Sequence, residues 1–111
     1  MRIWDLEPSL LCRQHLLGEH RELHGCWRIL TLKKKGYSRH PETQRWVGKE
    51  AALYARHEAL VAEMRRRGWT GHKSDLDETL IAGSSDAQDT FLHTIEEQIE
   101  LIRAKGCDCR V

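Results

Sequence analysis

Apolar residues recur at helical spacing in three parts of this 111-residue chain, and no part alternates between apolar and polar positions as a strand would. The three stretches cover about residues 8–31, 42–67 and 87–105. A proline in the first turn opens the first stretch, and glycines end the second and the third. We therefore expect an all-α fold, a compact single domain over residues 1–111 with three main helices.

The apolar positions of these stretches predict the core. In the first helix they are Cys12, Leu16, Leu23, Trp27 and Leu30; in the second they are Trp46, Val47, Leu53, Tyr54, His57, Leu60, Val61 and Met64; in the third they are Phe91, Leu92, Ile95, Ile99 and Ile102. Packing also accounts for Cys26, which lies close to Cys12 on the first helix. Gly18 and Gly25 interrupt that helix at a cost of roughly 1 kcal/mol each, which is tolerable where another backbone or a nucleic acid comes close.

Charge is nearly balanced, with a net charge of +1, but it is unevenly distributed. A basic loop over residues 33–41 separates the first two helices, and acidic residues dominate the last third. The basic part could follow a phosphate backbone or simply form solvated helix ends. No apolar run approaches the about 20 residues that span a membrane, and Asp5 and Glu7 interrupt any secretory signal. We expect a cytoplasmic protein with reduced cysteines.

Acidic and basic side chains gather on one side of the first predicted helix. His15, Glu19 and Glu22 share a face, with Gln14 and Arg21 beside it. The chain also begins with an α-amine, whose pKa of about 7.7–8.0 leaves a useful nucleophilic fraction at neutral pH. An amine of this kind can attack C1′ of a nucleotide and form a Schiff base while a carboxylate moves protons. The same residues could equally be surface groups in i,i+4 contacts.

His20 and His24 are the pattern closest to a metal motif. Their spacing is H-x-E-x-H, which differs from H-E-x-x-H and points Glu22 away from the histidines. A packed or surface histidine pair is the favoured interpretation, and we expect no metal and no cofactor. The alternative is a thiol or zinc protein built on this pair and the terminal Cys107 and Cys109, although two thiols alone do not make a four-ligand site.

The segments Arg2-Ile3, Gln14-His15-Leu16, Glu19 and Arg21-Glu22-Leu23 resemble the phage pyrimidine-dimer DNA glycosylase family, at the family's spacing and without a gap. Residues 49–69 resemble its second long helix. The resemblance implies a DNA-repair glycosylase with abasic-site (β-elimination) lyase activity, which cleaves the strand. It implies that the amine of Met1 is the nucleophile and that Glu22 is the catalytic acid–base. The residues that it implies contact DNA are Arg2, Gln14, His15 and Arg21.

The chain departs from the family at both ends. Met1 stands where the phage enzyme has a threonine, which leaves the amine in place. Residues 106–111 replace an aromatic tail associated with lesion recognition. We therefore expect lyase action on abasic sites, or removal of a damaged pyrimidine other than the cyclobutane dimer. The expected partner is double-stranded damaged DNA, bound by a monomer. The alternative is a non-catalytic helical DNA-binding module on the same scaffold.

Overall fold

The computed structural model describes residues 2–36, 38–69, 71–72, 76–81 and 83–111. All regular elements in these ranges are helical, which confirms the all-α expectation. In chain order they are the 3₁₀ turn η1 (Pro8–Leu10), α1 (Arg13–Leu32), α2 (Pro41–Gln44), α3 (Glu50–Arg66), the 3₁₀ turn η2 (Glu78–Ile81) and α4 (Ile95–Arg103).

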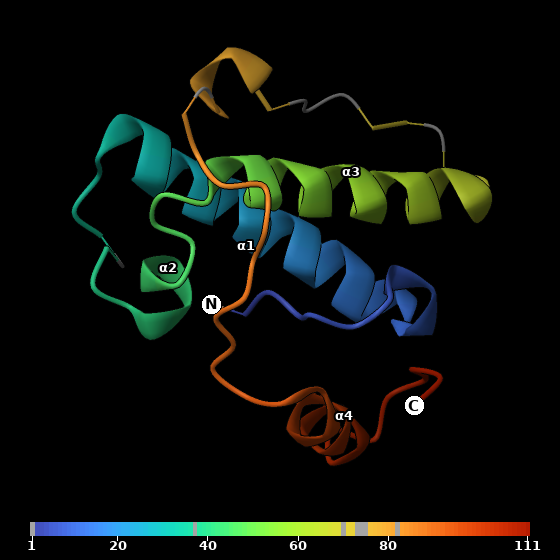
Figure 1. Ribbon diagram of the computed structural model, residues 1–111. Coiled ribbons are helices and arrows are strands. Elements are labelled where there is room, and N and C mark those ends of the chain that lie inside the picture. Colours follow the sequence, from blue (N-terminus) through green and yellow to red (C-terminus); the bar gives the residue numbers. More distant parts are fainter. Residues whose placement is uncertain (1, 37, 70, 73–75, 82) are drawn as a thin grey trace.

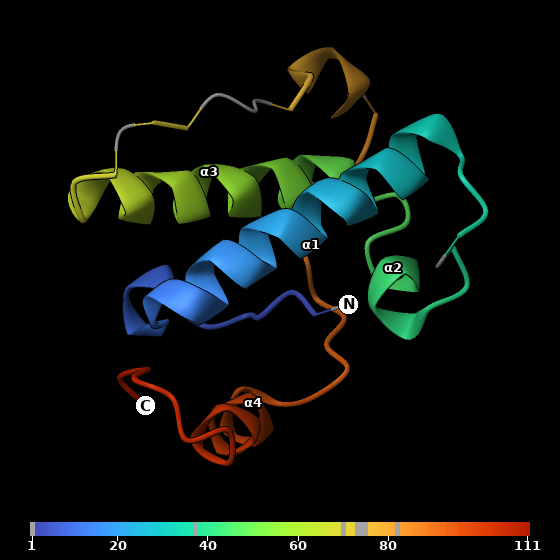
Figure 2. The same ribbon diagram turned by 180° about the vertical axis from the view of Figure 1, so that it is seen from behind.

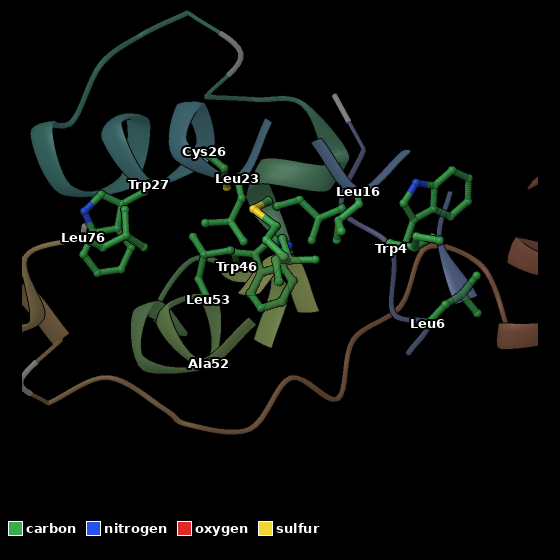
Figure 3. Close-up of a cluster of buried hydrophobic side chains, with 14 of the residues drawn as sticks. Trp4, Leu6, Leu16, Leu23, Cys26, Trp27, Trp46, Ala52, Leu53 and Leu76 are labelled. Atoms are coloured by element: carbon green, nitrogen blue, oxygen red, sulfur yellow. The ribbon is translucent and has the colours of Figure 1, made fainter. Parts of the chain in front are cut away.

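The two long helices α1 and α3 lie side by side and form the centre of the molecule (Figures 1 and 2). The N-terminal segment, residues 2–7, runs along α1 on the side that faces α4. Figure 3 shows how the tryptophans and leucines of these elements fill the space between them. The N-terminal segment is part of this core, since Ile3, Trp4 and Leu6 are each less than 5% exposed.

The first helix begins later than the sequence predicts. Pro8 opens only the short turn η1, and Leu11 and Cys12 are extended before α1 starts at Arg13. Cys12 is therefore the half-buried residue that precedes the helix, and the prediction that it packs in the core is wrong. Cys26 is fully buried, as expected. At the other end Lys33 adopts a left-handed conformation with φ 55°, which stops α1 before the basic loop.

The second predicted helix is two helices, α2 and α3. Residues 45–49 interrupt it, because Gly48 adopts a positive φ of 75° and turns the chain. Arg45 is buried at this corner, where its guanidinium reaches into the body of the protein. Trp46 is buried as predicted, and its indole Nε1 donates to Glu42 at 3.3 Å. Tyr54 is half-buried against the same core.

The third predicted helix is much shorter than the apolar pattern suggests, because it begins at Ile95 instead of after Asp86. Residues 83–93 form an irregular connection that bonds to the start of α3, where Ala52 N donates to Ser85 O at 3.1 Å. The side chains of Ser85 and Gln88 form hydrogen bonds with backbone groups two residues later, and such local bonds compete with a helix. Thr94 and Glu97 then form a capping box that fixes the true start. Phe91 and Leu92 are exposed.

Candidate active site and DNA interface

Two arginines, the buried Arg45 and the half-buried Arg56, fasten the N-terminal segment to the rest of the molecule. The first is Arg45, whose Nη2 donates to the carbonyl oxygen of Ile3 at 2.8 Å and whose Nη1 donates to Asp5 at 3.0 Å. Its Nε donates to Glu42 at 2.7 Å. Because the guanidinium is almost fully buried and bonds to both carboxylates, the backbone at Ile3 is held in one place.

The second is Arg56 on α3. Its Nη1 donates to the carbonyl oxygen of Leu6 at 2.7 Å, and its Nε and Nη2 donate to the two oxygens of Glu19 at 2.7 and 3.0 Å. Glu19 is 2% exposed. Burial raises the pKa of its carboxyl, and the charge of Arg56 opposes that rise. Glu19, predicted to lie on a polar face, is therefore the buried acid that links α1, α3 and the N-terminal segment.

A third contact comes from α4. Gln98 is buried and accepts a hydrogen bond from the backbone N–H of Asp5 at 2.8 Å, while its Nε2 donates to the Asp5 carboxylate at 3.0 Å. Chain termini are usually poorly ordered unless other elements hold them. Here α3, α4 and the corner at Arg45 all bind residues 3–6, so the fold determines the position of these residues.

Glu22 lies on α1 one turn beyond Glu19, and it is half-buried. Seven residues separate it from His15, so the two lie on one side of the helix, which we call the glutamate flank. Gln14 and Arg21 are exposed. The N-terminal segment runs antiparallel to α1, since Leu11 precedes the helix start and Trp4 packs edge-on against His15 with 6.1 Å between ring centroids.

Met1, the predicted nucleophile, lies outside the residues that the structure describes. Arg2 is described, and its guanidinium is stacked over the ring of Trp4 at 4.5 Å and bonded to His93 at 3.0 Å. Burial lowers the pKa of Arg2 from its ordinary value. Its Nη2 is buried and has no hydrogen-bond partner within the described part of the chain. A cationic N–H in this situation is suited to an anion such as a phosphate.

The basic loop lies close to this site. In both views the described chain starts beside α2 and the middle of α1, and the loop connects these two helices (Figures 1 and 2). Lys35, Ser38, Arg39 and His40 line a shallow hollow on the loop. At Gly18 and Gly25 an added Cβ would meet nothing within 4 Å, so no backbone in the described chain approaches either glycine. Both positions face open space.

His20 and His24 lie on the opposite side of α1, which we call the histidine flank. Glu22 and His24 are two residues apart and therefore about 200° apart around the helix. The structure adds two histidines that the sequence analysis did not connect with this pair, His57 from α3 and His72. Burial and the three neighbouring imidazoles lower the pKa of His20 to about 4, so its ring is neutral at neutral pH.

The terminal cysteines do not join these histidines. Cys107 and Cys109 instead approach Cys12 and His15 at the start of α1. The alternative that combined His20 and His24 with the terminal thiols is therefore wrong in its pairing. His15 has a contact that its expected role at the DNA does not include, because its Nδ1 is 3.2 Å from the Cys12 sulfur.

The fold and this geometry define a small helical protein whose N-terminal segment is fastened beside the buried Glu19 and carries, at Arg2, a cationic N–H without a partner among the described residues. The family model of the pyrimidine dimer DNA glycosylases matches residues 1–77, and the chain belongs to that family. Its class of activity is thus that of a DNA-repair glycosylase. No curated protein and no solved structure gives a significant match to the chain. Among its described helices, none has the length and apolar character needed to cross a membrane.

Proposed function

We propose that the protein is a DNA glycosylase with abasic-site lyase activity that uses the amine of Met1 as nucleophile and Glu22 as acid–base. The observation that carries the proposal is the fastening of residues 3–6 by Arg45, Arg56 and Gln98. A catalytic terminus has to be held within reach of its partner, since orientation supplies much of the rate.

The reaction needs an amine and a carboxylate. The amine lone pair forms a bond to C1′, and the glycosidic bond breaks so that its electron pair leaves with the base. Opening of the C1′–O4′ bond then gives the Schiff base. A carboxylate takes a proton from C2′, and the C3′–O bond to phosphate breaks with its electron pair. Water finally releases the sugar and restores the amine.

The proposed DNA contacts are Arg2, Gln14, His15 and Arg21. The Nη2 atom of Arg2 has no hydrogen-bond partner among the described residues, and the side chains of Gln14 and Arg21 are exposed on α1. The basic loop would extend the contact along the phosphate backbone. The proposed substrate is double-stranded DNA with an abasic site or a damaged pyrimidine, extruded from the stack and bound by a monomer in the cytoplasm.

Trapping with borohydride tests the covalent step. A duplex with one abasic site should form a covalent complex with the protein, because borohydride reduces the Schiff base to a stable amine. One residue added before Met1 should abolish trapping and leave binding to the duplex intact. Trapping that is indifferent to this extension would overturn the role of Met1. Binding without any trapping or cleavage would identify a non-catalytic DNA-binding module.

Substitution of Glu22 tests its proposed role as the acid–base. Glu22→Gln should still bind the abasic duplex and lose strand cleavage. Glu7→Gln is the matched control, since Glu7 is an exposed carboxylate of the N-terminal segment with no capping bond. Equal cleavage rates for the two variants would exclude Glu22 as the acid–base.

A further inference from the structure

In the part of the chain that the structure describes, two groups of four metal-ligating side chains contain neither Met1 nor Glu22. One of the two groups includes His15, which is also among the proposed DNA contacts. The histidine cluster consists of His20, His24, His57 and His72. The thiol cluster consists of Cys12, His15, Cys107 and Cys109. Within each group the ligand atoms all lie within 4.8 Å of one another.

The histidine cluster has the dimensions of a tetrahedral site. The Nε2 atom of His20 lies 3.3 Å from that of His57, 3.0 Å from that of His72 and 3.1 Å from that of His24. The Nε2 atoms of His24 and His57 are 3.1 Å apart. A zinc ion with bonds of about 2.0–2.1 Å sets its nitrogen ligands about 3.3 Å apart. The observed spacings are therefore close to those around an ion.

A carboxylate orients one of these rings. The Nδ1 atom of His57 lies 3.0 Å from Oε1 of Glu58, so the ring proton on that nitrogen points to the carboxylate. The Nε2 atom then presents its lone pair to the cluster. This arrangement of carboxylate, imidazole and ion is usual for metal-bound histidines. His57 is also fully buried, so its imidazole is fixed against the core of α3.

We propose that His20, His24, His57 and His72 bind one divalent ion of the zinc class through their Nε2 atoms. Four protein ligands fill a tetrahedral shell, so the ion is structural and leaves no open position for water. Two ligands come from α1, one from α3 and one from residues 71–72, which follow α3. The ion therefore links the two central helices on the side of α1 away from Glu22.

Separate contacts at the thiol cluster indicate a second metal site. The Nδ1 atom of His15 lies 3.2 Å from the sulfur of Cys12 and 3.3 Å from that of Cys109. The backbone N–H of Cys12 donates to the Cys109 sulfur at 3.0 Å. Three cysteines and one histidine are a common structural zinc set, and the start of a helix favours thiolates. This ion would fasten the C-terminal tail to the first turn of α1.

Metal analysis of the full-length chain, purified without chelator, tests both sites. We expect two zinc ions per chain. His72→Gln and His24→Gln should each keep only the ion of the thiol cluster. The double variant Cys107→Ser/Cys109→Ser should keep only the ion of the histidine cluster. The matched controls are His40→Asn, which keeps a capping side chain on α2, and Cys26→Ala in the core. Both controls should keep two ions.

Cobalt distinguishes the two sites by their ligands. After chelation and dialysis, the full-length chain should take up Co²⁺, and the thiol cluster alone should give thiolate-to-cobalt charge-transfer absorption. That band should disappear in the double cysteine variant and persist in His72→Gln. Failure of the wild-type chain to hold stoichiometric zinc or cobalt would overturn both sites. A disulfide between two of the clustered cysteines in the purified protein would overturn the thiol site alone. A histidine variant with unchanged metal content would overturn the histidine site alone.

Discussion

The two flanks of α1 carry different chemistry on one helix. The glutamate flank has a half-buried carboxylate, exposed polar side chains and the N-terminal segment beside it. The histidine flank has four imidazoles whose Nε2 atoms face one another and a carboxylate, Glu58, that contacts His57. The buried stripe between the flanks, which includes Leu16, Glu19 and Leu23, keeps them apart. The proposed acid–base Glu22 and the histidine cluster therefore lie on different sides of the same helix.

The largest expected effect is a separation of activity from metal content. Glu22→Gln should reduce strand cleavage by about 10²–10⁴-fold, the usual contribution of a positioned acid–base, and should leave the zinc content unchanged. His24→Gln should lose an ion and keep cleavage within a few-fold of the wild type. Parallel measurement of single-turnover cleavage and metal content checks the pair. Loss of metal in Glu22→Gln would show that the flanks are coupled.

The buried pair between the flanks gives the next effect. Arg56→Met should destabilise the protein by about 3–5 kcal/mol, because it leaves Glu19 buried without its partner. The double variant Glu19→Leu/Arg56→Met should recover most of that loss, since neither charge remains. Urea unfolding of both variants measures the difference. A cost below about 1 kcal/mol for Arg56→Met would mean that Glu19 finds another partner or becomes neutral easily.

Sequence patterns found the parts of this site that depend on local spacing. The placement of Glu22 and His15 on one side of α1 follows from helical periodicity, and so does the pairing of His20 with His24. The sequence did not connect His57 and His72 with His20 and His24, because they lie at least 33 residues from that pair in the chain. The burial of Glu19 depends on Arg56, 37 residues later. Helical periodicity relates residues within one helix, so it reveals neither the histidine cluster nor the Glu19–Arg56 pair.

The missed boundaries have more local causes. Thr94-Ile95-Glu96-Glu97 is a capping-box sequence, which marks the start of α4 without any structure. The apolar periodicity continues back through Phe91 and Leu92, and for that reason the sequence analysis placed the helix start too early. The interruption of the second helix was harder to see, since it requires both the left-handed conformation at Gly48 and the buried ion pairs of Arg45.

Arg2 tests whether the glutamate flank binds phosphate. Arg2→Gln should weaken binding to the abasic duplex and reduce the slope of log affinity against log salt by about 1, because one phosphate contact is lost. Its metal content should remain at the wild-type value. Arg103→Gln is the matched control, since Arg103 is exposed on α4 and pairs only with Glu100 within the described chain. Equal salt slopes for the two variants would exclude Arg2 from the interface.

The smallest effect concerns the contact between α3 and the residues that lead into α1. Arg67 donates to the carbonyl oxygens of Pro8 and Leu11, and its Nε donates to Glu63 at 3.1 Å. The hydrogen bonds from Arg66, with those from Arg67, lower the pKa of Glu63 from its ordinary value of 4.5. A lowered carboxyl pKa stabilises the fold above the ordinary value, and this contribution is lost as the pH falls through the lowered pKa.

Glu63→Gln should therefore lower the thermal midpoint by a constant amount at neutral pH, equivalent to less than about 1 kcal/mol for a solvent-screened pair. The difference in thermal midpoint between Glu63→Gln and the wild type should narrow as the pH falls below about 4.5. It should vanish in stronger acid, where Glu63 is protonated in both the folded and the unfolded state. Calorimetry across this range measures the difference, and Glu96→Gln on α4 controls for the loss of an exposed charge. A difference that is constant down to strong acid would mean that the stabilisation by Glu63 does not depend on its charge. The contribution of Arg67 to stability would then come from its hydrogen bonds to the carbonyl oxygens of Pro8 and Leu11.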